Sequence, residues 1–412
     1  MEKFPLDGKS RTRKAPKVRT VAKEDMDREF GGDFFAIQPS CLLFPDSRFS
    51  ATCSRWEGNS SFPGIASEVD LQGAGVVRCG VLPWFSDNRF PLYLAPMAGV
   101  TDLIFRQICK ELGADVMVTE FVSAEGIMQA DERTRKYTEF TDEQRPVGVQ
   151  LFGADGERMG EAAKKIIDWK RPDFIDINFG CPVNKVVARN GGSSLLKDCP
   201  ILASVAAGVA KAVGDQVPVT AKMRIGWDES SINAVEVAKI LEDSGMQAIA
   251  VHGRTRAQGY GGEANWDVID AVARAVSIPV IGNGDIHCGA DLVKRKRETA
   301  VSGVMIGRAA MQNPWVFREA KHFLETGKVL EEVGVDERWE LVLRHCKLAV
   351  DSGRNGNEKQ TLTAMRSRLM AYCKGFPGAK ELRQKLCHVS SVTEVEDLAA
   401  WSLQKHLVLA EL

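Results

Sequence analysis

One cysteine stands where it could take part in chemistry. Cys181 lies in the segment INFGCPVNKVVARNGGSSLL, between Gly180 and Pro182, where a loop follows an apolar run. A cysteine in a reduced protein is usually a small buried apolar residue, but a packing role is hard to justify at the start of a loop. An unperturbed thiol has a pKa of about 8.5 and is mostly protonated at neutral pH. Cys181 could therefore donate a proton as well as attack as a thiolate.

Three polar residues near the ends of other apolar runs form a second set of candidates. They are Gln150, Lys222 and His252. A lysine that ends a buried strand rarely lies there without a partner, whereas a histidine by itself would more often be a core residue with satisfied hydrogen bonds. Together the three favour one cavity that a flavin would fit. The flavin's dimethylbenzene edge is apolar, its pyrimidine edge needs donors, and its reduced anion needs a nearby cation.

Two short turns are candidates for binding phosphate. Asn283-Gly284-Asp285 and Gly307-Arg308 follow the last two apolar runs. Backbone N–H groups in such turns bind anions in barrel proteins, and Arg308 could add a charge-assisted contact. The alternative is that these glycines only allow tight turns between a strand and a helix.

The elements that would position these residues form a regular series. Eight short apolar runs occur at 92–97, 114–121, 146–153, 174–182, 217–226, 248–255, 278–286 and 303–310. Segments with helical periodicity separate them, which predicts a parallel sheet covered by helices. Eight such units favour a closed (β/α)8 TIM barrel, whose active site lies at the carboxyl ends of the strands. The alternative is an open doubly wound sheet, but no G-x-G-x-x-G follows the first run.

The two flanks of the predicted barrel (89–325) differ from it. Residues 1–88 lack sustained periodicity and are predicted to be a poorly ordered extension, and residues 1–23 carry eight Lys or Arg against two acids. Organelle targeting stays an alternative, although Glu2, Asp7, Glu24 and Asp25 argue against it. Residues 330–412 are predicted to form a small all-helical domain. Within it, residues 338–385 hold eleven Lys or Arg and four acids, which is either a solvated face or a surface for phosphates.

Composition narrows the class of protein. The 412 residues carry a net charge of −1, and the ten cysteines form no C-x-x-C pair, which argues against a disulfide scaffold or a zinc site. No apolar run approaches the ~20 residues that span a bilayer, and no secretory signal is visible. We expect a cytoplasmic protein without a metal, a membrane or an obligate protein partner. Local charge still allows a nucleic-acid partner.

Several motifs together resemble the tRNA-dihydrouridine synthases, nearest their bacterial B branch. They are LAPMAGVTD, VGVQLFG, DFIDINFGCPVNKVVARNGGSSLL, VTAKMRIGWD, VHGRTRAQGYGGEANWD, IPVIGNGDI and VMIGRAAMQNPW. The resemblance spans about residues 90–390 and includes MRSRLMAYCKGFPGAKELR, which is similar to that family's helical tRNA-binding domain. It implies an enzyme that reduces a uridine of tRNA to 5,6-dihydrouridine, with FMN as cofactor and NADPH or NADH as reductant.

The resemblance also implies roles for individual residues. The implied FMN-binding residues are Pro96, Met97, Ala98, Gln150, Lys222, His252, Asn283, Gly284, Asp285, Gly307 and Arg308. Cys181 is the implied proton donor to C5 of the uracil, while C6 receives hydride from flavin N5. We expect tRNA contacts from Asn178, Lys185, Arg254 and Arg256 at the barrel mouth, and from Arg366, Arg368 and Lys374 in the helical domain.

Some features depart from the family, and two other functions compete. Asn190-Gly191-Gly192 stands where the family often has Gly-Ala-Gly, and the basic segment 294–303 puts the packing of its helix in doubt. The N-terminal extension resembles nothing in the family. A flavin barrel similar to dihydroorotate dehydrogenase, acting on a free pyrimidine, would not explain the basic helical tail. A non-enzymatic RNA-binding protein would not explain Cys181, Lys222 and the two phosphate turns.

Overall fold

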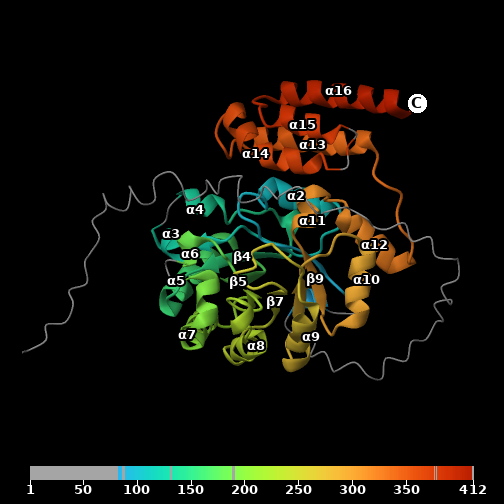
Figure 1. Cartoon of the computed structure of the whole chain (residues 1–412). Helices are drawn as coiled ribbons and strands as arrows, with labels where there is room; N and C mark the ends of the chain where they lie inside the picture. Colours follow the sequence, from blue (N-terminus) through green and yellow to red (C-terminus); the bar gives the residue numbers. More distant parts are fainter. Residues whose placement is uncertain are drawn as a thin grey trace, which may run out of the picture. The chain divides into compact units, whose positions relative to one another are not determined.

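Parallel strands close into a barrel. The computed structural model describes residues 82–85, 89–129, 132–187, 191–374, 376 and 378–410. The strands follow the order β1-β9-β8-β7-β6-β5-β4-β2, and a bridge between Tyr93 and Val116 joins the first to the last. Figure 1 shows strands of this barrel, among them β4, β5, β7 and β9, with helices around them. Their bounds are β1 Leu92–Leu94, β2 Met117–Val118, β4 Val147–Phe152, β5 Phe174–Phe179, β6 Val219–Arg224, β7 Ile249–His252, β8 Val280–Asn283 and β9 Gly303–Ile306, and β3, Val122–Ser123, pairs with β4 beside this path. The predicted (β/α)8 barrel is confirmed, and the open sheet is excluded.

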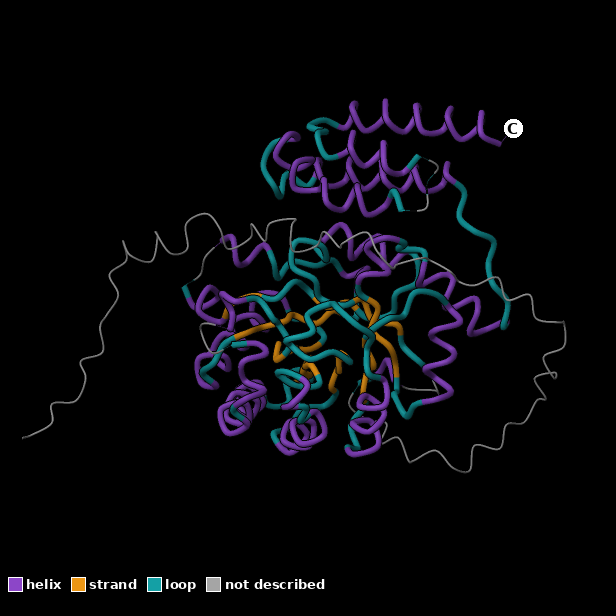
Figure 2. Tube along the Cα trace, in the orientation of Figure 1, coloured by secondary structure: helices purple, strands orange, loops and turns teal. Residues whose placement is uncertain are grey.

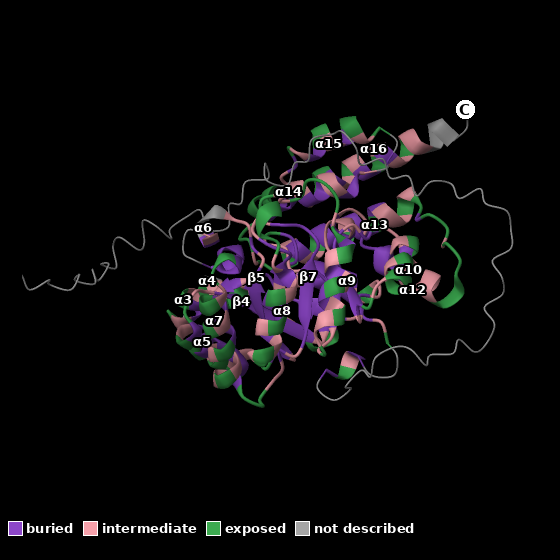
Figure 3. Ribbon diagram, turned by 60° about the horizontal axis from the view of Figure 1, so that its bottom comes forward, coloured by how far each residue is buried: buried purple, intermediate pink, exposed green. Residues whose placement is uncertain are grey.

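Burial on both faces explains the apolar runs. All six residues of β4 and of β5 are buried, since side chains fill the barrel on one face and helices cover the other. Figure 2 shows the strands enclosed by helices, and Figure 3 shows β4, β5 and β7 as buried. The polar residues within these strands are therefore held inside the protein.

Helices alternate with the strands around the barrel. They are α2 Leu103–Glu111, α3 Ala124–Met128, α4 Glu132–Lys136, α5 Gly156–Lys170, α6 Asn184–Val187, α7 Cys199–Val213, α8 Ala234–Asp243, α9 Trp266–Ala275, α10 Gly289–Glu298, α11 Arg308–Gln312 and α12 Val316–Thr326. Side chains that precede several helices accept a hydrogen bond from the first turn, as Asp155 does from the Arg158 amide at 2.8 Å. Such caps fix where a helix begins.

The basic segment at 294–303 does not disturb its helix. Leu292 of α10 is fully buried, and the long cations cover aromatic rings. The Arg295 guanidinium lies 4.9 Å from the centroid of Trp266, and the Lys296 ammonium lies 5.2 Å from that of Phe90. Because the stems of such side chains are apolar, they cover hydrophobic surface while their charges stay near water.

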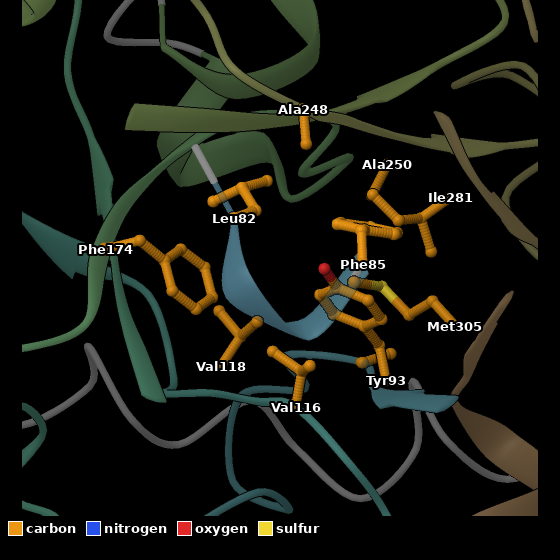
Figure 4. Packing of buried hydrophobic residues seen from close by; sticks show 11 residues of the cluster. Leu82, Phe85, Tyr93, Val116, Val118, Phe174, Ala248, Ala250, Ile281 and Met305 are labelled. Atoms are coloured by element: carbon orange, nitrogen blue, oxygen red, sulfur yellow. The ribbon is translucent and has the colours of Figure 1, made fainter. Parts of the chain in front are cut away.

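A short N-terminal segment closes one end of the barrel. Leu82, which precedes the 3-10 turn Pro83–Phe85, and Phe85, which ends it, pack among barrel side chains that include Tyr93 (Figure 4). The Trp84 indole N–H donates to the Tyr93 hydroxyl at 2.6 Å, and its ring lies 5.3 Å from Phe174, the first residue of β5. Residues 82–85 were predicted to belong to the poorly ordered extension. They instead form part of the core, while residues 1–81 lie outside the described part of the chain.

Four helices follow the barrel and form the predicted helical domain. They are α13 Val335–Asp351, α14 Glu358–Tyr372, α15 Ala379–Leu386 and α16 Val392–Ala410. Their buried faces carry Trp339, Leu362, Leu369 and Leu382. In α14, Asn357 and Gln360 cap each other's backbone amides at the start of the helix. None of the helices described here has the length and apolar character needed to cross a membrane.

Candidate active site

A chain of hydrogen bonds joins polar side chains of three neighbouring strands inside the barrel. The Gln150 amide donates to Asp176 Oδ2 at 2.6 Å and accepts from the Asn178 amide at 2.8 Å. Thr220 Oγ1 donates to the other Asp176 oxygen at 2.5 Å. Gln150 and Asp176 are register partners on β4 and β5, so the strands themselves bring them together. The network fixes the Gln150 amide in one orientation inside the barrel.

Lys222 on β6 supplies a cation beside this network. Its Nζ lies 3.3 Å from Asn283 Oδ1, and the Asn283 amide donates to the Met305 carbonyl at 2.6 Å. Burial and, to a smaller extent, Arg224 lower the pKa of Lys222 to about 8, although Asp176 opposes both. A half-buried ammonium with a lowered pKa is strongly stabilised by any anion that binds next to it.

His252 on β7 is a neutral imidazole among cations. Burial lowers its pKa well below the ordinary value, and four neighbouring cations lower it further. These cations are Arg224, Lys222, Arg254 and Arg308. Asp285 pairs with Arg254 at 2.8 Å and with Arg308 at 3.3 Å. Arg254 Nη1 is buried without a hydrogen-bond partner in the described part of the chain. Such a group of cations is suited to bind an anion.

The two predicted phosphate turns lie at this cluster. Gly284 has a φ of +132°, which other residues rarely adopt, and a Cβ atom there would lie 2.5 Å from the Ala264 Cβ. At Gly307 a Cβ atom would lie 3.4 Å from Ala95 Cβ and 3.6 Å from Met97 Sδ. Gly284 is therefore required for the turn itself. Gly307 leaves the surface open beside Met97, which is itself a predicted FMN-binding residue.

Cys181 is held firmly at the end of β5. Its amide donates to Asn178 Oδ1 at 2.8 Å, and its carbonyl accepts from the Ser193 amide at 3.2 Å and hydroxyl at 2.8 Å. The residue is 6% exposed. Burial raises the pKa of its thiol, and the cations Arg224 and Lys222 only partly oppose this. Cys181 is therefore a neutral thiol at neutral pH and can donate a proton.

Gly192 packs directly against Cys181. It has a φ of +60°, and a Cβ atom there would lie 3.0 Å from the Cys181 carbonyl oxygen and 3.1 Å from the Cys181 Cβ. Because glycine leaves this space empty, the loop after β5 can close onto the cysteine. The departure from the family pattern at 190–192 keeps a glycine at this position.

Two arginines predicted to contact tRNA are buried instead. Arg254 is 1% exposed and donates to the carbonyls of Gly261 and Gly262 as well as to Asp285. Arg368 is 4% exposed and binds residues of the first barrel turn. Both were expected from the sequence to contact tRNA, whereas in the structure both side chains are buried. Their guanidinium groups satisfy backbone carbonyls inside the protein.

The other residues predicted to contact tRNA differ in their exposure and in the groups that they contact. Arg366 is partly exposed and donates to the carbonyls of Val389 and His388, both at 2.9 Å. Lys374 Nζ donates to Gln312 at 3.1 Å, and the Arg256 guanidinium lies 4.5 Å from the Trp227 ring centroid. Asn178 is buried in the network around Gln150. The side chain of Lys185 lies outside the described part of the structure.

Sequence reasoning missed several residues of the site. Asp176, Thr220, Ser193 and Gly192 hold Gln150 or Cys181 in place. A charged residue inside the apolar run FIDINF is a signal that could have found Asp176, because a buried charge needs partners. Ser193 and Gly192 lie in a loop and carry no comparable signal.

The fold and the site define a barrel enzyme, because acid, amide and cationic groups converge at the carboxyl ends of the strands. The profile of one family, described as Dihydrouridine synthase (Dus), matches residues 93–408. A tRNA-dihydrouridine synthase B of Pseudomonas aeruginosa is 41% identical over 309 residues, which cover 75% of this chain and 90% of that protein. The chain therefore belongs to the dihydrouridine synthase family, and the resemblance of its motifs is confirmed.

More distant relatives carry similar names. A probable tRNA-dihydrouridine synthase 1 of Synechocystis is 39% identical over 306 residues, covering 74% of this chain and 84% of the relative. A probable tRNA-dihydrouridine synthase of Aquifex aeolicus is 33% identical over 318 residues, covering 77% and 97%. Among solved structures, a histamine dehydrogenase from Rhizobium has a TM-score of 0.43 at 14% identity over 68% of this chain and 48% of its own. That similarity is too low to bear on function.

Proposed function

We propose that this protein reduces the C5=C6 bond of a uridine in tRNA to 5,6-dihydrouridine, with FMN as cofactor and NADPH or NADH as reductant. The family and its named relatives support the reaction. The observation that carries the proposal is a buried neutral thiol, Cys181, whose pKa responds to the cations Lys222 and Arg224. A proton donor and a cationic, amide-lined site thus lie within electrostatic reach of each other.

The residues present fit FMN. Arg254 Nη1 is a buried donor without a partner in the described residues, and the cations Arg254, Arg308 and Lys222 all act on His252. Lys222, Gln150 and His252 would hold the ring system. The phosphate and ribitol side would be held by Pro96 to Ala98, Asn283 to Asp285, Gly307 and Arg308. When bound, FMN supplies the hydride for C6 of the uracil, and the reduced nicotinamide restores it.

Cys181 supplies the proton in this proposal. Its Sγ–H gives the proton to C5 of the uracil, so that hydride and proton together saturate the double bond. Arg224 and Lys222 then stabilise the thiolate that remains, because both are cations that lower the pKa of this thiol. The thiolate regains its proton from solvent before the next turnover. Asn178 and Ser193 keep the cysteine in place throughout.

The tRNA must present a flipped base. Extruding a base from folded RNA costs on the order of a few kcal/mol, and contacts to the RNA backbone must offset this cost. We assign such contacts to Lys185, Arg256, Arg366 and Lys374. Binding measured at several salt concentrations tests them, since each lost phosphate contact makes the negative slope of log K against log salt shallower by about 0.7–0.9.

The decisive experiment is mass spectrometry of nucleosides from unmodified tRNA after incubation with the protein, FMN and NADPH. We expect dihydrouridine from the wild type and little from Cys181→Ala, although that variant still binds FMN and is reduced by NADPH. Normal product from Cys181→Ala would show that another acid supplies the proton. If the wild type binds and reduces FMN but forms dihydro product only from free pyrimidines, the enzyme acts on small molecules instead.

A further inference from the structure

Arg368 of α14 reaches out of the helical domain into the turn between β1 and α2. Its Nη2 donates to the carbonyls of Gly99 at 3.0 Å and Val100 at 2.6 Å, and its Nη1 pairs with Asp102 Oδ2 at 3.0 Å. Its side chain is 5% exposed. Arg368 thus contacts three residues of one short segment that directly follows Pro96, Met97 and Ala98.

The same turn is held from the barrel side. The Gly99 amide donates to Glu120, which follows β2, so the amide and the carbonyl of Gly99 are bound by different parts of the protein. Arg106 donates to the Thr101 carbonyl at 2.6 Å. Within the turn, the Val100 amide donates to the Met97 carbonyl at 3.0 Å, and Gly99 has a φ of +72°. The turn has little freedom while all of these contacts are present.

Arg368 is itself held in one position. Its Nη1 lies 3.0 Å from His345 Nε2, and His345 Nδ1 lies 2.9 Å from the Tyr372 hydroxyl. Burial, with a smaller contribution from Arg368, lowers the pKa of His345 to about 3, so the ring is neutral at neutral pH. Nε2 must then accept from Arg368, and the proton on Nδ1 is donated to Tyr372. The guanidinium also lies 5.3 Å from the ring centroid of Phe105 in α2.

Asp102 ties this arrangement to the helix that follows. Its Oδ1 accepts from the Phe105 amide at 2.9 Å and caps α2, while Oδ2 binds Arg368. Burial alone would raise the pKa of Asp102, but the charge and hydrogen bond of Arg368, together with the Phe105 amide, outweigh it and the pKa is about 2. The carboxylate is therefore charged at neutral pH, and the buried cation has an ionised partner.

We propose that Arg368 is a positioning residue, which sets the conformation of the turn Met97–Thr101 and thereby the segment that holds FMN. This inference rests on the proposed function, because that proposal assigns Pro96, Met97 and Ala98 to the cofactor. Without the guanidinium, the Gly99 and Val100 carbonyls and the Asp102 carboxylate lose their shared donor. The turn then gains freedom, and cofactor binding must order it again.

The test compares Arg368→Ala and Arg368→Lys with Arg344→Ala. Arg344 of α13 also links the helical domain to the barrel, since it pairs with Glu111 of α2 at 2.6 Å, but it contacts the far end of that helix. We would measure the dissociation constant of FMN with cofactor-free protein by quenching of flavin fluorescence. We expect at least tenfold weaker binding for Arg368→Ala, an intermediate value for Arg368→Lys, and a change below twofold for Arg344→Ala.

Amide hydrogen exchange of the peptide that covers Met97–Phe105 gives a second readout without cofactor. We expect faster exchange in Arg368→Lys than in the wild type or in Arg344→Ala. If Arg368→Ala does not fold, Arg368→Lys carries both measurements. Unchanged FMN affinity and unchanged exchange in the Arg368 variants would overturn the inference. A wild type that binds no FMN would overturn the proposed function, and hydrogen exchange would still decide whether Arg368 orders the turn.

Discussion

Replacement of Gly192 by alanine tests whether the loop after β5 positions Cys181. The new methyl group would lie 3.0 Å from the Cys181 carbonyl oxygen, 3.0 Å from Val186 Cγ1 and 3.1 Å from the Cys181 Cβ. These distances are a few tenths of an ångström too short. Ser193 binds the same carbonyl, so relief of the clash weakens that hydrogen bond, at about 0.5–1.5 kcal/mol. The left-handed backbone costs a further 1–2 kcal/mol or so.

Gly327 provides a control. It has a φ of +69° and the left-handed conformation, but a Cβ atom there would meet no atom within 4 Å. Gly327→Ala therefore shows the cost of a left-handed backbone without the contact to Cys181. We expect both variants to lose stability, by about 1–2 kcal/mol for Gly327→Ala and about 2–3 kcal/mol for Gly192→Ala.

The activity of the two variants should differ more than their stability. A displacement of about 1 Å near reacting atoms can cost on the order of a hundredfold in rate, so a smaller shift of Cys181 should cost about tenfold. The assay is single-turnover formation of dihydrouridine by enzyme with pre-reduced flavin, measured well below the melting temperature of each variant. Equal rates for Gly192→Ala and Gly327→Ala would refute the idea that this contact positions the thiol.

Three further results are expected. Trp84→Phe should lower the free energy of unfolding by about 1–3 kcal/mol in a urea titration, because the buried Tyr93 hydroxyl loses its donor, and an unchanged midpoint would contradict this role. Burial raises the pKa of the Cys181 thiol, and the thiol can donate its proton only below this pKa. The rate of dihydrouridine formation should therefore fall only at a pH above the ordinary thiol pKa. A fall in rate at neutral pH would contradict the role of Cys181 as proton donor. Asp102→Asn should be less stable than the wild type at pH 7. Because folding lowers the pKa of Asp102 to about 2, the difference in stability should shrink as the pH falls from about 4 to about 2. A constant difference across that range in thermal melts would show that the Arg368 pair is not its source.

The barrel and the centre of its site could be predicted because both depend on local patterns. Strands buried on both faces give nearly continuous apolar runs, and a barrel brings the carboxyl end of each run to one rim. Gln150, Lys222, His252 and Cys181 could therefore be found from their places in their runs. The segment 82–85 could not, since a three-residue turn has no periodicity and its partners Tyr93 and Phe174 are defined only by the closed barrel.

The buried arginines show where sequence reasoning reaches its limit. A count of basic residues over 338–385 predicts a charged surface, but it does not say which side of α14 faces water. Arg368 is buried because it binds Asp102 and the carbonyls of Gly99 and Val100. These partners lie more than 260 residues earlier in the sequence. Only tertiary structure distinguishes Arg368 from Arg366, which is two residues away and partly exposed.

The distance along the chain between Gly99 and Arg368 has a consequence for synthesis on the ribosome. The two residues are 269 positions apart, and a ribosome adds about 5–20 residues per second, so the arginine emerges roughly 13–54 s after the turn that it binds. Strand β1 also waits for β9, whose Met305 is the register partner of Tyr93. The first segment of the barrel to be made is thus among the last to be completed. Until then it is a natural target for chaperones that bind exposed apolar strands.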